Sequence, residues 1–145
     1  MVRARRRARR LALQALYEAD AVGHDADAVL TRLLEDGKLS EDNASFAREL
    51  VRGVVAHRKE IDRRIRKHAP AWPIAQMPTI DKNVLRLAIF EIIIDNRIPV
   101  TIGINEAVEL AKNFGGDSSP KFVNGVLGSI VLQFKKNESV ETKGG

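Results

Sequence analysis

The sequence contains no cysteine, and aromatic residues account for only 5% of its 145 residues. Without cysteine the chain can form no disulfide framework, thiolate zinc site or cysteine nucleophile. With so few aromatics, the core has to be built from Leu, Ile, Val and Ala. The hydrophobic content of 44% and the charged content of 30% are ordinary for a globular protein. The length suits one domain with a substantial core.

Long apolar runs are also missing. The longest, Leu87 to Ile94, is interrupted by Glu91 and is too short to span a bilayer. Gln14, Glu18 and Asp20 interrupt the apolar segment that a secretory signal would need after a basic start. We therefore expect a cytoplasmic protein with no membrane partner. An organellar transit peptide is the alternative for an Arg-rich amphipathic start, but such peptides are Ser-rich, and here the pattern continues into expected core.

Helical periodicity dominates the chain, and no segment is a convincing strand. Small and apolar residues recur at three- and four-residue steps, and Gly, Pro and Ser mark the breaks. Helices are expected over residues 4–19, 26–34, from the N-cap Ser40 toward His57, around 61–65 and ending before Pro70, 80–94, 102–114, and from the cap pair Ser119 and Pro120 to Phe134. The sequence predicts an all-α fold, a compact bundle of six or seven helices.

One segment, 80–94, is apolar on most sides and is expected at the centre of the bundle. It carries Arg86, which we expect to be buried and paired with Glu91 or Glu106, because buried charges need partners. The whole of residues 1–135 is expected to form a single helical domain. Residues 136–145 are expected to be a polar, disordered tail.

The basic residues are concentrated at one end. The stretch RARRRARR contains six arginines and no acid, while the rest of the chain holds 18 Lys and Arg against 19 Asp and Glu. The net charge of +5 therefore originates in the first ten residues. Such concentration indicates an anion-binding surface rather than a general basic tilt.

At about 100° per residue, the first helix presents these arginines in a defined arrangement. The face pointing away from the apolar stripe holds Arg3, Arg6, Arg7, Arg10, Gln14 and Tyr17, and the edge of the stripe holds Arg5 and Arg9. Arginine suits phosphate, and tyrosine can stack on an unpaired base. The pattern favours a nucleic acid as the ligand. The alternative is a solvated charged face, which would more naturally include Glu.

Other motifs carry less chemistry. Lys121 and Phe122, at the start of the last helix, offer a second anion and base contact, although Phe122 could equally belong to the core. His24, His57 and His68 lack metal-ligand spacing. We expect no metal, no cofactor and no catalytic residues.

Three stretches together resemble one family, the NusB family of bacterial transcription antitermination factors. They are RRRARRLALQALYEAD, IDKNVLRLAIFEI, and INEAVELAKNFG followed by KFVNGVLGSI. The resemblance covers nearly the whole chain and implies two small helical subbundles and no enzymatic activity.

The resemblance also implies a function. It predicts binding of the boxA element in ribosomal RNA leader transcripts, together with the ribosomal protein NusE, in a complex that helps RNA polymerase read through termination signals. The implied RNA contacts are Arg5, Arg6, Arg7, Arg9, Arg10, Tyr17, Lys121 and Phe122. The implied partner-protein surface is Asp81 and Lys82. One departure is Ser118-Ser119-Pro120, where the family often has an acidic residue.

Two other functions stay open at this point. The same helical module occurs as an accessory RNA-binding domain of RNA cytosine methyltransferases, an architecture that requires a following α/β cofactor domain. A protein-binding scaffold whose arginines contact an acidic partner is also compatible with the charges. Self-association to a homodimer, known in some family members, could bury the arginine face.

Overall fold

The computed structural model of the chain describes the backbone of residues 2–69 and 71–144 and the side chains of residues 5–69 and 71–137. Within these ranges all regular structure is helical. The elements are α1 (Val2–Val22), α2 (Ala26–Leu34), α3 (Glu41–Ala56), α4 (Arg58–His68), the 3₁₀ turn η1 (Ile74–Gln76), α5 (Thr79–Ile89), the π-helical segment η2 (Phe90–Ile94), α6 (Val100–Phe114) and α7 (Ser119–Gly144). The all-α prediction is confirmed.

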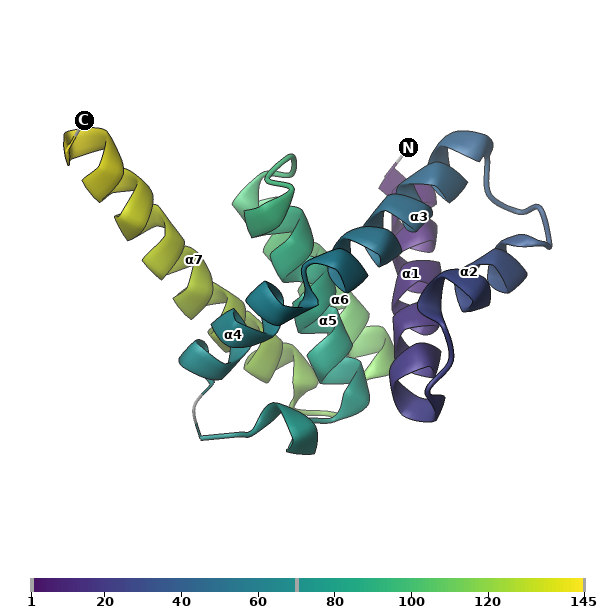
Figure 1. The fold of residues 1–145 in the computed structure, drawn as a ribbon, viewed down its shortest axis with the longest axis horizontal. Helices are drawn as coiled ribbons and strands as arrows, with labels where there is room; N and C mark the ends of the chain where they lie inside the picture. The colour runs from purple at the N-terminus through teal and green to yellow at the C-terminus, as the bar shows by residue number, and fades with distance from the viewer. Residues whose placement is uncertain (1, 70, 145) are drawn as a thin grey trace.

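The helices form two groups (Figure 1). In the first, α1, α2 and α3 pack on one another, and in the second, α5 packs against α4, α6 and α7. Contacts of α1 and α3 with α5 join the groups. The expected two helical subbundles are therefore present. Because α7 runs to Gly144, it includes most of residues 136–145; the single domain over 1–135 and the disorder of that tail stay predictions.

Helix ends follow the local chemistry of the sequence. The side chain of Ser40 accepts a hydrogen bond from Asn43 N at 3.2 Å and caps α3, as predicted. The boundary near His57 is a full break between α3 and α4. The predicted cap at Ser119 is wrong by one residue, because Ser119 is already helical and its hydroxyl accepts from Gly116 N and donates to Asp81.

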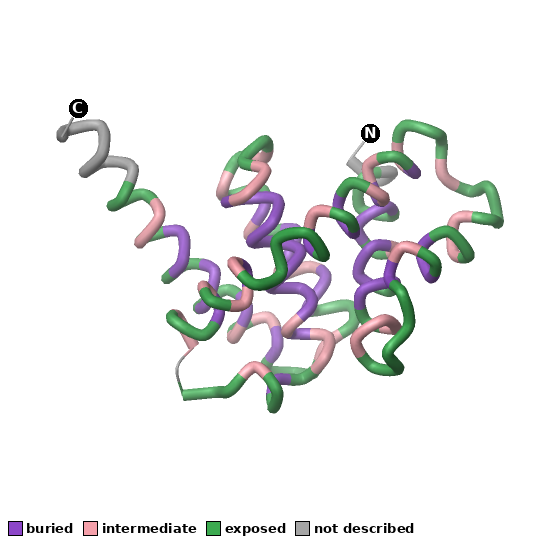
Figure 2. Tube along the Cα trace, in the orientation of Figure 1, coloured by how far each residue is buried: buried purple, intermediate pink, exposed green. Residues whose placement is uncertain are grey.

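The segment from Asn83 to Ile93 is buried throughout and forms the centre of the molecule (Figure 2). Its second half is wider than an α-helix, since Asp95 N and Asn96 N bond to the carbonyls five residues earlier. Phe90, in this wider turn, lies directly against α3 at Gly53. A Cβ at position 53 would come within 2.1 Å of the Phe90 ring, so only glycine permits this contact.

The buried Arg86 has different partners from those predicted. Its guanidinium binds Asp62 of α4 through two hydrogen bonds, at 2.8 and 3.0 Å, and Asp20 of α1 at 3.2 Å. Pairing with Glu91 or Glu106 is therefore wrong. Five residues at about 100° each place Glu91 on another side of the central helix from Arg86, and both glutamates instead meet arginines of α1.

Asp20 is the shared acceptor of this cluster. It also receives Lys82 Nζ and Asn83 Nδ2, each at 3.1 Å. Burial raises the pKa of Asp20, but the hydrogen bonds from Lys82 and Asn83 and the charges of Arg86 and Lys82 outweigh it, so the pKa lies below its usual value. The stability that this carboxylate supplies is therefore present above its unfolded pKa and is lost as the pH falls through the lowered, folded value.

Replacing Arg86 with Met tests the cluster. Arg86→Met leaves two carboxylates, Asp20 and Asp62, without the cation between them, and we expect the free energy of unfolding to fall by about 3–5 kcal/mol in urea denaturation. The control is Arg52→Met, because Arg52 forms only an exposed pair with Asp27 and should cost less than about 1 kcal/mol. Equal losses in the two variants would show that Arg86 has no special role.

Candidate nucleic-acid interface

The outer face of α1 is built as the helical periodicity predicted. Five of its members are exposed: Arg6, Arg7, Arg10, Gln14 and Tyr17. The sixth, Arg3, lies outside the residues whose side chains are described. Beneath this face, Ala8, Ala12, Ala15 and Leu16 are buried in the core. The arginines thus start a helix that continues without a break into the core, so they are held rather than loose.

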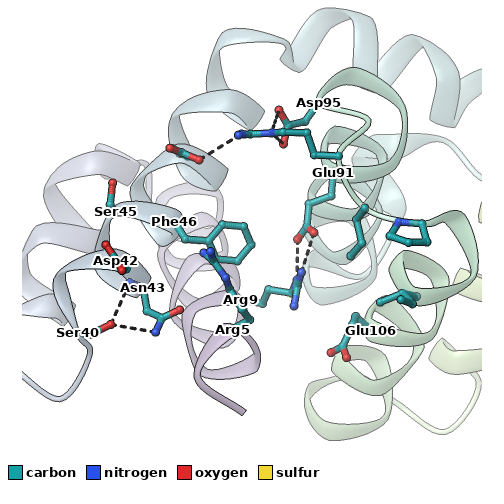
Figure 3. Close-up of a pocket in the computed structure, with 15 residues that line it drawn as sticks. Arg5, Arg9, Ser40, Asp42, Asn43, Ser45, Phe46, Glu91, Asp95 and Glu106 are labelled. Atoms are coloured by element: carbon teal, nitrogen blue, oxygen red, sulfur yellow. Dashed lines mark hydrogen bonds and ion pairs between the residues drawn. The ribbon is translucent and has the colours of Figure 1, made fainter. Parts of the chain in front are cut away.

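The arginines at the edge of the stripe are engaged within the fold. Arg9 is buried and binds both carboxylate oxygens of Glu91, at 2.7 and 3.0 Å. Arg5 remains exposed but lies over the ring of Phe46, 4.1 Å from its centroid (Figure 3). Arg9 therefore joins α1 to the central helix and does not present its guanidinium to a ligand.

Three arginines of the outer face differ in how far their guanidinium groups are already bonded within the fold. Arg6 Nε donates to both oxygens of Glu106, at 3.0 and 3.2 Å, although its own side chain is half-exposed. Arg7 has one long contact, 3.4 Å, to the carbonyl of Lys38. Arg10 has no ion pair with any carboxylate in the described part of the chain. Arg7 and Arg10 can therefore offer whole guanidinium groups to an anion such as phosphate.

A cleft of about 840 Å³ lies between α1 and α3 on one side and the end of the central helix and α6 on the other. Its wall contains Arg5, Arg9, Phe46, Glu91 and Glu106 (Figure 3). Charges of both signs line it, and the basic ones are already bonded or stacked. Among the described residues no group of three or more His, Asp or Glu could hold a metal ion. Anion binding is thus best served by the exposed face of α1, outside this cleft.

The second predicted contact lies at the start of α7. Lys121 is exposed, and Phe122 is half-buried and packs edge-on against Trp72, with ring centroids 5.0 Å apart. Phe122 therefore contributes to packing while keeping part of its ring at the surface. Trp72 itself is 36% exposed. A mixed aromatic and basic surface results.

The residues expected to meet a partner protein are engaged internally. Asp81 is buried and accepts a hydrogen bond from Ser119, and Lys82 binds Asp20. The loop that departs from the family pattern is thus tied to the start of α5 through Ser119. The partner-binding role of Asp81 and Lys82 stays a prediction, and neither offers a free charged group for it.

Sequence reasoning did not identify the residues that hold the arginine helix: Phe46, Glu91 and Glu106. Arg9 and Glu91 are 82 residues apart, and Arg6 and Glu106 are 100 apart. No local spacing signals such pairs. The only available hint was that buried acids need a cation.

A sequence model of the NusB family matches residues 6–132 of the chain. The chain belongs to the NusB family. It is 54% identical over 130 residues to the transcription antitermination protein NusB of Dehalococcoides mccartyi (strain ATCC BAA-2266 / KCTC 15142 / 195), a match that covers 90% of this chain and 91% of that protein. It is therefore a transcription antitermination factor of the NusB type.

Solved NusB structures share the fold. The structure of T. maritima NusB superposes with a TM-score of 0.82 at 33% identity and covers 87% of this chain and 89% of its own. A crystal structure of the antitermination factors NusB and NusE in complex with dsRNA superposes with a TM-score of 0.81 at 31% identity, covering 90% and 97%. Within the described residues, no helix combines the length and apolarity needed to span a bilayer.

Two glutamates that bind α1 arginines give a matched test of this site. Glu91→Gln leaves the buried Arg9 without a counter-charge and should lower the free energy of unfolding by about 3 kcal/mol. Glu106→Gln only releases Arg6, which is half-exposed, and should cost less than about 1 kcal/mol. Urea denaturation measures both. If the order were reversed, Arg6 rather than Arg9 would be the arginine that holds the helix.

Proposed function

We propose that this NusB family member binds a boxA-type element in the leader of ribosomal RNA transcripts together with a NusE-type ribosomal protein. In this role it is a non-catalytic RNA-binding component of an RNA polymerase antitermination complex. The observation that carries the proposal is the exposed arginine face of α1. The face combines guanidinium groups without carboxylate partners with one exposed aromatic ring.

The chemistry of this face suits single-stranded RNA. Arg7 and Arg10 lie one turn apart on the helix and present planar donors that match phosphate oxygens. Tyr17 is 41% exposed on the same helix, two turns further along, where its ring can stack on an unpaired base. Positive charge alone would bind any polyanion; the added ring favours a nucleic acid with accessible bases.

The remaining contacts would come from Arg5, Arg6, Lys121 and Phe122, with Arg3 and Gln14 as further members of the outer face. Arg6 would have to exchange Glu106 for a phosphate, while Arg5 keeps Phe46 below its plane and its edges free. Arg9 is assigned a positioning role, since its fork is occupied by Glu91. The solved structure of the similar NusB with NusE and dsRNA supports the choice of RNA and a NusE-type protein as partners.

The arginine face can be tested by its salt dependence. Replacing Arg6, Arg7 and Arg10 with Gln should weaken binding to a boxA-type RNA and reduce the log–log salt slope by roughly 2, because each phosphate contact on a single strand contributes about 0.7. The fold should persist, since all three side chains are exposed. Fluorescence anisotropy titrations at several salt concentrations measure this.

Two controls accompany that experiment. Arg32, Arg52 and Arg97 changed to Gln remove the same charge from exposed, carboxylate-paired positions and should leave the slope unaltered. Tyr17→Ala should lower affinity by roughly 1–3 kcal/mol through lost stacking with no change of slope. An unchanged slope in the α1 variant would reassign its arginines to a protein partner.

The partner protein gives an independent prediction. Adding purified NusE should raise the affinity for a boxA-type RNA, because a second basic protein surface adds phosphate contacts. The measurement is an RNA titration with and without NusE, beside an RNA of scrambled sequence. Identical affinity in the two titrations would refute the joint binding proposed here.

A further inference from the structure

Helix α4 has a basic surface of its own. Its eleven residues, RKEIDRRIRKH, include six Lys and Arg against two acids. The net charge of the chain beyond residue 10 is close to zero and does not reveal this surface. Many acids in that part of the chain form ion pairs within the fold, and the Lys and Arg residues without a carboxylate partner remain at the surface.

Four of these cations form one stripe. Lys59, Arg63, Arg66 and Lys67 are all exposed, at the spacing i, i+4, i+7 and i+8. At about 100° per residue they fall within one quadrant or so of the helix, directly opposite the buried Ile61 and Ile65. The stripe therefore points straight out from the core, and it extends about 12 Å along the helix axis at 1.5 Å per residue.

No acid of the helix neutralises the stripe. Glu60 pairs with Arg64, and Asp62 is held by Arg86 and Arg58. None of the four stripe cations forms an ion pair with a carboxylate in the described ranges, 5–69 and 71–137. The neighbouring His68 senses the same charge: burial first, and then Lys67 and Arg64, lower its pKa.

The stability of the helix does not explain the stripe. Cations in the last turn favour the helix dipole, which accounts for Arg66 and Lys67. Lys59, in the first turn, opposes the dipole. The pairs Lys59–Arg63 and Arg63–Lys67 place like charges at i,i+4, where they repel. The repulsion among Lys59, Arg63 and Lys67 is better explained by a ligand that neutralises these charges.

The stripe lies apart from the arginines of α1 but is linked to the second contact region, Lys121 and Phe122, through Trp72. In Figure 1, α4 and the start of α1 lie on opposite sides of α5 along the long axis of the molecule. Trp72 follows α4 by four residues, and its ring packs against Phe122, next to Lys121. His68, at the C-terminal end of α4, also contacts Ser129, two turns along α7 from Lys121. The stripe and Lys121 therefore lie on helices that touch.

We propose that the stripe Lys59, Arg63, Arg66 and Lys67 binds the phosphate backbone of RNA that flanks the segment held by α1. This inference rests on the proposed function for the identity of the ligand. The spacing of the four cations over about 12 Å suits successive phosphates. The stripe has no exposed aromatic among its members, so the contact would be independent of sequence and would add affinity for longer transcripts.

The test uses the full chain and two RNAs: a short RNA with only the boxA-type segment, and the same RNA extended on both sides by oligouridine. In a variant with Lys59, Arg63, Arg66 and Lys67 changed to Gln, binding of the short RNA should be unchanged. The tighter binding of the extended RNA should be lost, with a salt slope lower by about 3 for four contacts. Lys59→Gln with Arg63→Gln, which leaves the last turn intact, should lose about half of that slope.

The matched control changes Arg32, Arg52, Arg97 and Lys112 to Gln, since all four are exposed and carboxylate-paired.

If control and stripe variants lose equal affinity, or if wild type binds both RNAs equally, the inference is overturned. Retained RNA binding with loss of polyglutamate or anionic vesicle binding overturns it in favour of another partner. If the short RNA binds no better than a scrambled one while the extended RNA depends on the stripe, the proposed function fails and the inference stands. A circular dichroism spectrum and a cooperative melting transition like those of wild type check that the variants fold.

Discussion

A guanidinium cannot remain charged inside an apolar bundle without acceptors. Arg86 is buried at the centre of the bundle, so its acceptors have to come from the neighbouring helices. Its two carboxylate partners come from α1 and α4, which belong to different helical groups. The requirement can be met only when α1, α4 and α5 are all in place. Apolar packing supplies most of the driving force for such a fold, but it is non-directional, whereas this cluster specifies which helices meet and at which residues.

A second buried ion pair, Arg9 with Glu91, also joins two helices, and it decides which arginines of α1 are left for a ligand. It separates Arg9, which holds the helix, from Arg7 and Arg10, which remain available to a ligand. Arg5 and Arg6 are intermediate, because each is exposed yet already in contact with Phe46 or Glu106. The same separation occurs in α4, where Arg64 pairs with its own helix while Arg63 and Arg66 do not. In both helices, surface charge depends on what the fold leaves unpaired.

The fold was largely predictable, since helical periodicity and caps such as Ser40 are local properties of the chain. The outward face of α1 was equally accessible, because angle per residue alone placed Arg7, Arg10 and Tyr17 there. The partners of Arg86 were not, since they are set by how distant helices pack. Family resemblance pointed to Asp81 as a docking residue, yet its burial against Ser119 depends on a loop that departs from the family pattern. The net charge did not reveal the α4 stripe either, because a sum over residues does not show which acids are already ion-paired within the fold.

Because α1 is continuous, the rotational position of its arginines about the helix axis is fixed relative to the core. One uninterrupted helix carries both the residues that dock in the core and those that face solvent, and Arg9 fixes its rotation against Glu91. A single residue inserted after Arg10 would turn everything before it by about 100°. Arg9 would then leave Glu91, and a different set of arginines would face outward, with composition and net charge unaltered. The number of residues between the arginines and the core is therefore as much a part of the binding surface as the arginines themselves.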